Sequence, residues 1–234
     1  MEPFLARSPF PDAPRLLLRN AKPLAAGMDR WIFAHPGDPA LIVKVRRLDR
    51  LSAQSWRKRL LCRFHRHGYW GRYLYEIYEH LAAAHHHGVT PPWMQKWRGF
   101  ADTDLGPGLV YEAERQPDGS LAPTLGRLLR EGCVDEAARR DLEIFLQQIL
   151  ESPVVVADLH PDNLVHSGGR FVLIDGIGDH NALPLRQWFP ALNRRSKLKK
   201  CRRLWRACFP ISAIAKAPVP LPHWPSYASA ASRP

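Results

Sequence analysis

The sequence lacks the marks of a secreted, membrane-spanning or disulfide-stabilised protein. Four cysteines are present and no two of them form a C-x-x-C pair, so neither zinc-binding spacing nor a disulfide framework is indicated. No stretch of about 18 consecutive apolar residues occurs, so no transmembrane helix is predicted. Residues 1–14 hold no apolar segment of the signal-peptide type. We therefore expect a cytoplasmic protein.

Acidic residues are in short supply. The 234 residues include 22 Asp and Glu against 34 Lys and Arg, which gives a formal net charge of +12 at pH 7. This excess favours anionic partners such as phosphorylated small molecules, anionic lipid or nucleic acid. Much of it lies in segments 46–72 and 194–206, and the second holds eight Lys or Arg and no acid. Each segment is interpreted either as a solvated helix face or as a surface for an anionic sugar or membrane.

Aromatic residues flank the second basic segment. Trp188, Trp205 and Phe209 would suit a membrane interface if this segment contacted anionic lipid. Core packing of the C-terminal helices is the interpretation that we favour for them. A location at the inner membrane surface stays open beside the cytoplasmic one.

Hydrophobic residues make up 45% of the chain, enough for a folded core. Two strands joined by a turn at His35–Pro39 come first, and a helix follows with apolar residues at i, i+3, i+4 and i+7 from Leu74, ending near Gly88. Strands with one helix, followed mostly by helices, predict a two-lobed α+β protein. The later predicted segments are a strand at 109–113, helices at 124–130, 135–150 and 193–209, apolar runs at 154–156 and 171–174, and a loop at 179–188.

The most informative residues for chemistry are two aspartates and an asparagine. Asn163 follows Asp158 by five residues, and Asp175 closes an apolar run twelve residues later. A carboxylate can orient a hydroxyl and accept its proton, whereas amide and carboxylate oxygens suit Mg²⁺ bound to nucleotide phosphates. The spacing predicts Asp158 as a catalytic residue and Asn163 and Asp175 as magnesium ligands. Capping of turns is the alternative for each residue taken alone.

A lysine in an apolar strand supplies a second candidate. Lys44 lies in the run Leu41–Val45, and burial of its charge is costly without an anionic partner. Nucleotide phosphates would be such a partner, with a helix glutamate to hold the lysine. Residues 24–30 then occupy the place of a phosphate-covering loop. A side chain that extends to solvent is the alternative for Lys44.

Together these residues resemble the protein-kinase-like fold. Lys44 matches the lysine of the V-A-I-K strand. Asp158 and Asn163 match the Asp and Asn of the H-R-D-x-x-x-x-N catalytic loop, and Asp175 matches the Asp of D-F-G. The resemblance implies a nucleotide between a small β-rich N-terminal lobe and a larger helical C-terminal lobe.

A closer resemblance, to the PhoP regulatory network protein YrbL family, covers almost the whole chain. It implies a small, trimmed kinase-like fold of Gram-negative bacterial origin. It rests on short motifs spread along the chain, among them Pro23-Leu-x-x-Gly27, Ala34-His-Pro-x-Asp38, Tyr78-x-His-Leu81, Thr103-Asp-x-Gly106, Leu159-x-Pro-x-Asn163, Asp175-x-Ile-Gly178, Leu183-Pro-Leu185 and Arg203-Leu-Trp205.

The resemblance also implies further site residues and domain boundaries. Gly27 would cover the phosphates, and Glu112 lies in the hinge that receives the adenine. His160 replaces a kinase lysine near the transferring phosphate and is the second predicted catalytic residue; a solvent-facing loop histidine is the alternative for it. On the helix, Glu76 is preferred to Glu79 as the partner of Lys44. The boundaries are an extended tail 1–14, a domain 15–215 with an N-lobe 15–112, a hinge 112–120 and a C-lobe 120–215, and a disordered tail 216–234.

The leading prediction is an ATP- and Mg²⁺-dependent transfer of phosphate to a small-molecule or lipopolysaccharide-type sugar hydroxyl. The absence of A-P-E, which marks the protein-kinase activation segment, argues against a protein acceptor. A loop with one glycine, Gly27, motivates the first alternative, a pseudokinase that regulates an envelope-stress pathway. A basic nucleic-acid-binding protein is the second alternative, although no recognised nucleic-acid-binding module is visible.

Overall fold

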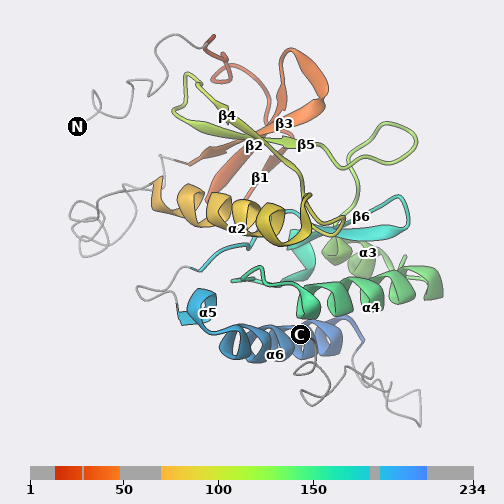
Figure 1. Ribbon diagram of the computed structural model, residues 1–234. Helices are drawn as coiled ribbons and strands as arrows, with labels where there is room; N and C mark the ends of the chain where they lie inside the picture. The colour runs from red at the N-terminus through yellow and green to blue at the C-terminus, as the bar shows by residue number, and fades with distance from the viewer. Residues whose placement is uncertain (1–13, 28, 48–69, 180–184, 210–234) are drawn as a thin grey trace, which may run out of the picture. The chain divides into compact units, whose positions relative to one another are not determined.

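The computed structural model describes residues 14–27, 29–47, 70–179 and 185–209, with element labels as in Figure 1. The predicted tails and nearly all of the basic segment 46–72 therefore lie outside the described residues. The chain divides into two compact units. Unit 1 comprises Met1–His80 and Gln95–Arg115, and unit 2 comprises Leu81–Met94 and Gln116–Pro234.

Unit 1 is built on one antiparallel sheet of five strands, in the order β1-β2-β3-β5-β4. Lys44 lies in the central strand, opposite Ile32 of β2 and Leu109 of β5. The strands are β1 (Ala25–Ala26), β2 (Arg30–His35), β3 (Asp38–Arg46), β4 (Trp97–Ala101) and β5 (Gly108–Glu112).

The second half of strand β3, from Ile42 on, is buried on both faces. Val43 and Val45 pack with Leu18 and Phe33, whereas Ile42 belongs to a second cluster that includes residues of helix α2 (Gly71–His87). Because side chains alternate along a strand, Lys44 shares a face with Ile42. The sheet therefore positions this lysine in a buried layer.

Helix α2 ends where the sequence predicts. Its last residue is His87, and Gly88 has a φ of +72°, a left-handed conformation that glycine adopts readily. The predicted apolar face is only partly correct: Ile77 is buried, but Tyr78 and Leu81 are more than half exposed. The buried face of α2 instead includes polar side chains, among them Glu76 and His80.

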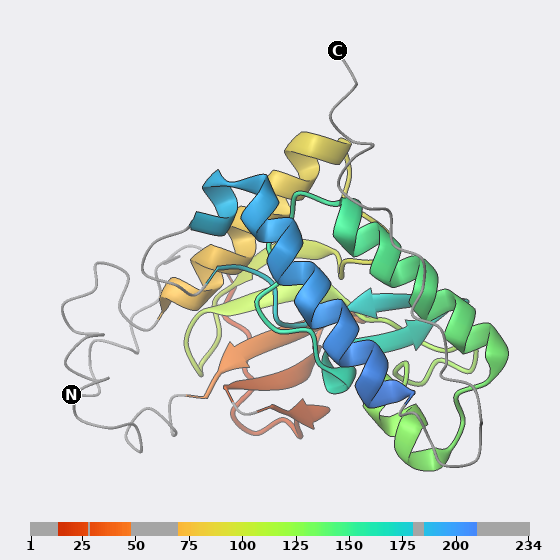
Figure 2. The same cartoon turned by 90° about the horizontal axis from the view of Figure 1, so that it is seen from below.

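Unit 2 combines helices with a two-stranded hairpin (Figures 1 and 2). Its longest helices pack against each other, and the apolar stripe predicted for residues 135–150 is buried as expected. The elements are α3 (Leu125–Glu131), α4 (Glu136–Glu151), the 3₁₀ turn η3 (Pro161–Asn163), β6 (Leu164–Ser167), β7 (Arg170–Leu173), α5 (Leu185–Trp188) and α6 (Pro190–Cys208).

Side-chain caps define where helices α3 and α4 begin. The hydroxyl of Thr124 accepts a hydrogen bond from Arg127 N at the start of α3, and the Asp135 carboxylate accepts one from Ala138 N at the start of α4. Such caps satisfy backbone N–H groups that have no partner within the helix.

Some sequence predictions were incomplete or wrong. Strands β1, β4 and β6 were not predicted: β1 has only two residues, β4 has Arg98 and Gly99 between its apolar residues, and β6 has only two apolar residues. The predicted loop 179–188 contains α5 at its end. The run 154–156 forms only one isolated antiparallel bridge, between Val156 and Ile177, and Asn193 donates its amide hydrogens to the carbonyls of Pro153 and Val154.

The architecture is α+β, with an antiparallel sheet before most of the helices. Among the helices of the described residues, none has both the length and the apolar composition needed to cross a membrane.

Candidate nucleotide and metal site

Lys44 is enclosed in unit 1, where only 2% of its surface is exposed. Its Nζ donates to Gln95 Oε1 at 2.7 Å and lies 4.2 Å from the centre of the Tyr111 ring. Gln95 Nε2 in turn donates to the carbonyl of Glu112 at 2.7 Å. Gln95 therefore connects the lysine to the end of β5, and the sequence patterns did not single it out.

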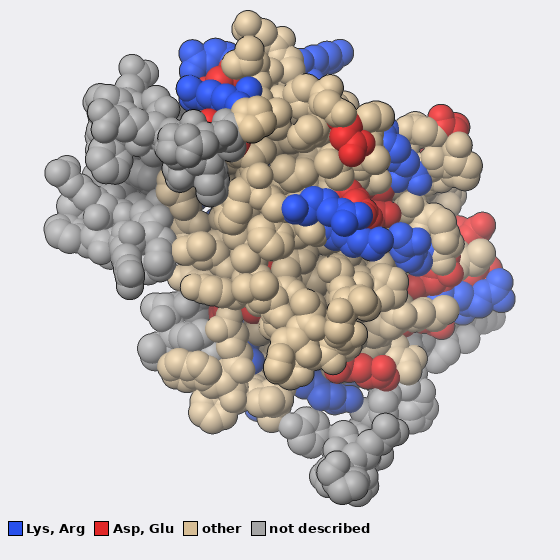
Figure 3. Space-filling model, turned by 45° about the horizontal axis from the view of Figure 1, so that its top comes forward, with Lys and Arg blue, Asp and Glu red and all other residues tan. Residues whose placement is uncertain are grey.

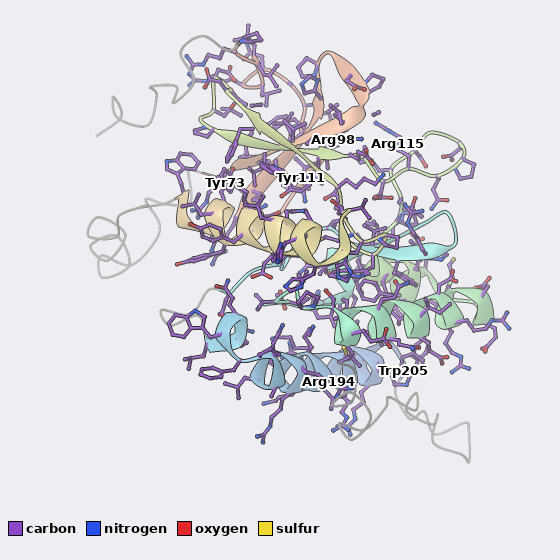
Figure 4. All side chains as sticks on the ribbon, viewed as in Figure 1. Tyr73, Arg98, Tyr111, Arg115, Arg194 and Trp205 are labelled. Carbon is purple, nitrogen blue, oxygen red and sulfur yellow. The ribbon has the colours of Figure 1, made fainter. Side chains whose placement is uncertain are left out.

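Glu76 of α2 is buried in the same unit. Its Oε2 lies 2.5 Å from Arg30 Nη2, and its Oε1 accepts a hydrogen bond from the Tyr111 hydroxyl at 2.5 Å. Figure 4 labels Tyr111 on β5 and Tyr73 on α2, and the Tyr73 hydroxyl donates to the carbonyl of Lys44. These contacts draw Glu76 and Lys44 into one polar cluster, but direct pairing of the two stays a prediction. Glu79, the other candidate, is buried as well.

His80 is a further buried member of this cluster, one turn after Glu76 on α2. Neither ring nitrogen has a hydrogen-bond partner among the described residues, and the ring lies 5.7 Å from that of Tyr111. Burial lowers the pKa of His80 from 6.5 to about 4; the charge of Glu76 opposes this shift and that of Lys44 adds to it. The folded protein thus holds His80 neutral near pH 7.

We expect His80 to make unit 1 sensitive to acid. Because the pKa is depressed in the folded state, the unfolded chain binds a proton that the folded protein excludes, so stability falls as the pH drops from 6.5 towards 4. In His80→Phe, the loss of unfolding free energy between about pH 7 and about pH 4.5 should be smaller by about 2 kcal/mol. Urea unfolding at the two pH values measures this difference.

The control for this prediction is His86→Phe, because His86 is an exposed histidine on the same helix. It should keep the pH dependence of the unsubstituted protein. An equal pH dependence in His80→Phe and the unsubstituted protein would contradict the role assigned to His80.

The two other nucleotide-binding candidates of unit 1 lie at its surface or edge. Gly27 is exposed and donates its N–H to the carbonyl of Arg30 at 2.9 Å, which closes the turn between β1 and β2. The Glu112 carboxylate forms ion pairs with Lys96, at 3.3 Å, and Arg98. Gln95 also donates to the Glu112 carbonyl. The carboxylate and the carbonyl of Glu112 are therefore both bound by other residues of unit 1.

Unit 2 brings Asp158, Asn163 and Asp175 together. The N–H groups of Ala157 and Asp158 both donate to the carbonyl of Gly176, at 2.7 and 3.0 Å. The Asn163 carbonyl accepts from Ile174 N at 2.9 Å, and Asn163 Nδ2 lies 3.4 Å from Asp158 Oδ2. Backbone hydrogen bonds thus hold the segment around Asp158 beside the end of β7, where Asp175 follows.

Gly176 explains why no aromatic follows Asp175. Its φ is +86°, and a Cβ atom built there would lie 2.1 Å from the carbonyl oxygen of Asp158. Any side chain at this position would collide with backbone. The close approach of the two segments therefore depends on glycine.

The oxygen atoms of Asn163 and Asp175 fit the chemistry of Mg²⁺. The asparagine turns Nδ2 towards Asp158, which leaves its amide oxygen as the atom able to bind a metal. Asp175 is half-buried, and its Oδ1 accepts from Gly176 N at 2.7 Å. Mg²⁺ commonly takes one or two protein oxygens together with phosphates and water. Within the described ranges, no cluster of three or more His, Cys, Asp or Glu forms a separate metal site.

His160 has a structural contact that the sequence reasoning did not weigh. The side chain is exposed, and Nδ1 accepts a hydrogen bond from Asp162 N at 3.3 Å, so that His160 caps the 3₁₀ turn η3. Asp162 is also 3.3 Å from Arg130 of α3. The catalytic role of His160 stays a prediction.

A buried ion pair follows the Asp175 segment. Asp179 is 1% exposed, and Arg186 of α5 donates Nη2 to its Oδ1 at 2.6 Å and Nε to its Oδ2 at 3.1 Å. Lys197 of α6 is equally buried and donates to the carbonyl of Ser152. The first contact joins α5 to the segment that follows Asp175, and the second joins α6 to the end of α4. The sequence shows Asp179 shortly after Asp175-Gly176, but no pattern in it predicts that Arg186, seven residues later, is the partner of Asp179.

Comparison with known proteins gives one consistent result. The model of the family described as PhoP regulatory network protein YrbL matches residues 16–209. Two curated relatives, both called "Uncharacterized protein YrbL" and found in Escherichia coli (strain K12) and Shigella flexneri, are each 26% identical over 213 residues. Each alignment covers 86% of this chain and 89% of the relative.

Proposed function

We propose that this chain, which belongs to the PhoP regulatory network protein YrbL family, has a kinase-like fold and transfers phosphate from ATP to a small-molecule or envelope-sugar hydroxyl. The observation that carries the proposal is the grouping of Asp158, Asn163 and Asp175 by hydrogen bonds within unit 2. The burial of Lys44 and Glu76, which both contact Tyr111 in unit 1, supports it.

Each residue would have a defined task. Asp158 would orient the acceptor hydroxyl and take up its proton as the oxygen attacks phosphorus. Asn163 and Asp175 would hold Mg²⁺, which supplies positive charge against the phosphate oxygens when bound. Lys44 would bind phosphate, and the rate gain would come from positioning and charge neutralisation.

The contacts of Lys44 favour a second candidate function. Its Nζ already donates to Gln95 and lies over the Tyr111 ring, and only 2% of the residue is exposed, so phosphate would have to reach a largely enclosed ammonium group. A kinase-like regulator that binds nucleotide weakly and transfers no phosphate would tolerate this arrangement.

Asp175→Asn is expected to abolish stabilisation by Mg²⁺ and ATP. A ligand at a hundred times its Kd stabilises the folded state by about 2.7 kcal/mol, and the melting temperature should rise by about 5–10 °C in a thermal-shift titration. Asp162→Asn is the matched control, because Asp162 is a neighbouring exposed carboxylate outside the proposed ligand set. It should keep the shift. No shift of the unsubstituted protein at millimolar ATP would contradict the proposal.

Asp158→Ala separates the two candidate functions. In a phosphotransferase, it should retain the Mg²⁺- and ATP-dependent thermal shift and lose phosphate transfer or ATP hydrolysis by about a thousandfold. A shift without turnover in the unsubstituted protein would support the regulator.

A further inference from the structure

Helices α5 and α6 leave a group of large apolar side chains in solvent. We call Leu185, Trp188, Phe189 and Leu192 the apolar patch; their exposed fractions are 41%, 62%, 52% and 45%. Leu185 and Trp188 lie in α5, Phe189 lies in extended backbone between the helices, and Leu192 lies in the first turn of α6, so the four fall within eight consecutive residues. Exposed apolar groups of this kind mark interaction surfaces more often than isolated exposed residues do.

A row of cations continues from the patch along α6. We call Arg195, Lys199, Arg202 and Arg206 the basic row; they follow Leu192 in steps of three or four residues, and all are exposed. In the portion of the chain that the structure describes, none of these four forms an ion pair. The other face of α6, with Cys201, Leu204 and Trp205, is buried in unit 2.

This surface differs in charge from other parts of the molecule. On the face drawn in Figure 3, basic and acidic side chains lie side by side. Helix α4 shows the same mixture, since Arg139 forms ion pairs with Glu136 and Glu143. Helix α6 contains no acidic residue at all.

We propose that the apolar patch and the basic row form one docking surface for an anionic lipid bilayer. An interfacial helix binds by inserting its apolar side chains below the headgroups while its cations contact anionic lipid. Trp188 is suited to the headgroup boundary, and the leucines find an apolar phase in the bilayer that nucleic acid does not offer. Among the three aromatics weighed above, Trp205 is buried in the core and only Trp188 is well exposed. The surface is independent of the proposed phosphate transfer.

Charge reversal in the basic row should weaken binding to anionic vesicles. The test is co-sedimentation of the full chain with vesicles of phosphatidylglycerol and phosphatidylethanolamine, compared with phosphatidylcholine alone. Each lost cation should cost about fivefold in partition coefficient, so Arg195→Glu with Arg202→Glu should lose at least about 25-fold. The control variant, Lys22→Glu with Arg140→Glu, has the same net charge as the test variant, but its two substitutions lie at exposed positions outside α6. It should bind the vesicles nearly as well as the unsubstituted protein.

The apolar patch has its own test. Trp188→Ala should weaken binding to the same vesicles by about tenfold, whereas Ile144→Ala, at a 56% exposed position on α4, should not. Circular dichroism of each variant checks that it is folded. Binding of the unsubstituted protein to neither vesicle, or an equal loss in the charge control, would overturn the proposal. Single-stranded RNA bound through the basic row, without vesicle binding, would assign the surface to nucleic acid instead.

Discussion

Gly176→Ala is expected to lower the melting temperature by about 10 °C, because it disrupts the contact that holds the Asp158 segment in place. The added Cβ would lie 2.1 Å from the Asp158 carbonyl oxygen, which itself belongs to backbone and cannot rotate away. Overpacking of this kind costs about 1–3 kcal/mol or more, and the left-handed backbone adds about 1 kcal/mol. For a chain of this size, each kcal/mol lowers the melting temperature by about 2–4 °C.

Gly119→Ala is the matched control for this prediction. Its φ of +82° is close to that of Gly176, but nothing lies within 4 Å of the added Cβ. It therefore carries only the backbone penalty, of about 1 kcal/mol. If the two variants melted at the same temperature, the close approach of Gly176 to Asp158 would contribute nothing to the stability cost of the substitution.

Asp179→Ala is expected to destabilise the protein by about 3 kcal/mol. The carboxylate is 1% exposed and binds Arg186 through two hydrogen bonds, so its removal leaves a largely buried guanidinium without its partner. Breaking a buried ion pair from one side typically costs about 3–5 kcal/mol, and the low end applies because the Arg186 side chain is 16% exposed. Chemical unfolding of the full chain measures the loss.

Two further variants test whether the charge is the cause. Glu136→Ala removes an exposed carboxylate that is paired with Arg139, and it should cost less than about 1 kcal/mol. Asp179→Leu combined with Arg186→Leu should be more stable than Asp179→Ala, because no unpaired charge is left buried. A double variant less stable than Asp179→Ala would show that packing, and not charge, dominates at this pair.

The grouping of Asp158, Asn163 and Asp175 could be anticipated from sequence because all three lie in one short segment. Asn163 is five residues from Asp158, and the hairpin formed by β6 and β7 returns the chain to Asp175. Local geometry therefore brings them together. The amide orientation of Asn163 and the capping contact of His160 are set by individual hydrogen bonds, which spacing cannot predict.

The cluster around Lys44 was harder to predict because its members come from distant segments. Gln95 lies 51 residues from Lys44 in the chain, and Arg30 lies 46 residues from Glu76. Apolar periodicity also gave a partly incorrect buried face for α2, because the sheet accepts Glu76 and His80 where a purely apolar core would exclude them. Polar residues whose burial depends on remote partners leave no periodic pattern.

The sequence by itself determined the α+β class, the ends of the main helices, the candidate motif of unit 2 and the family resemblance, because hydrophobic spacing, capping residues and short motifs act over a few residues. Only the tertiary structure decided that Gln95 contacts Lys44, that Arg186 neutralises Asp179, and that α6 buries Trp205 while Trp188 stays exposed. Such pairings depend on which distant surfaces meet, and the burial of each polar group is tolerated only where a partner arrives from another element.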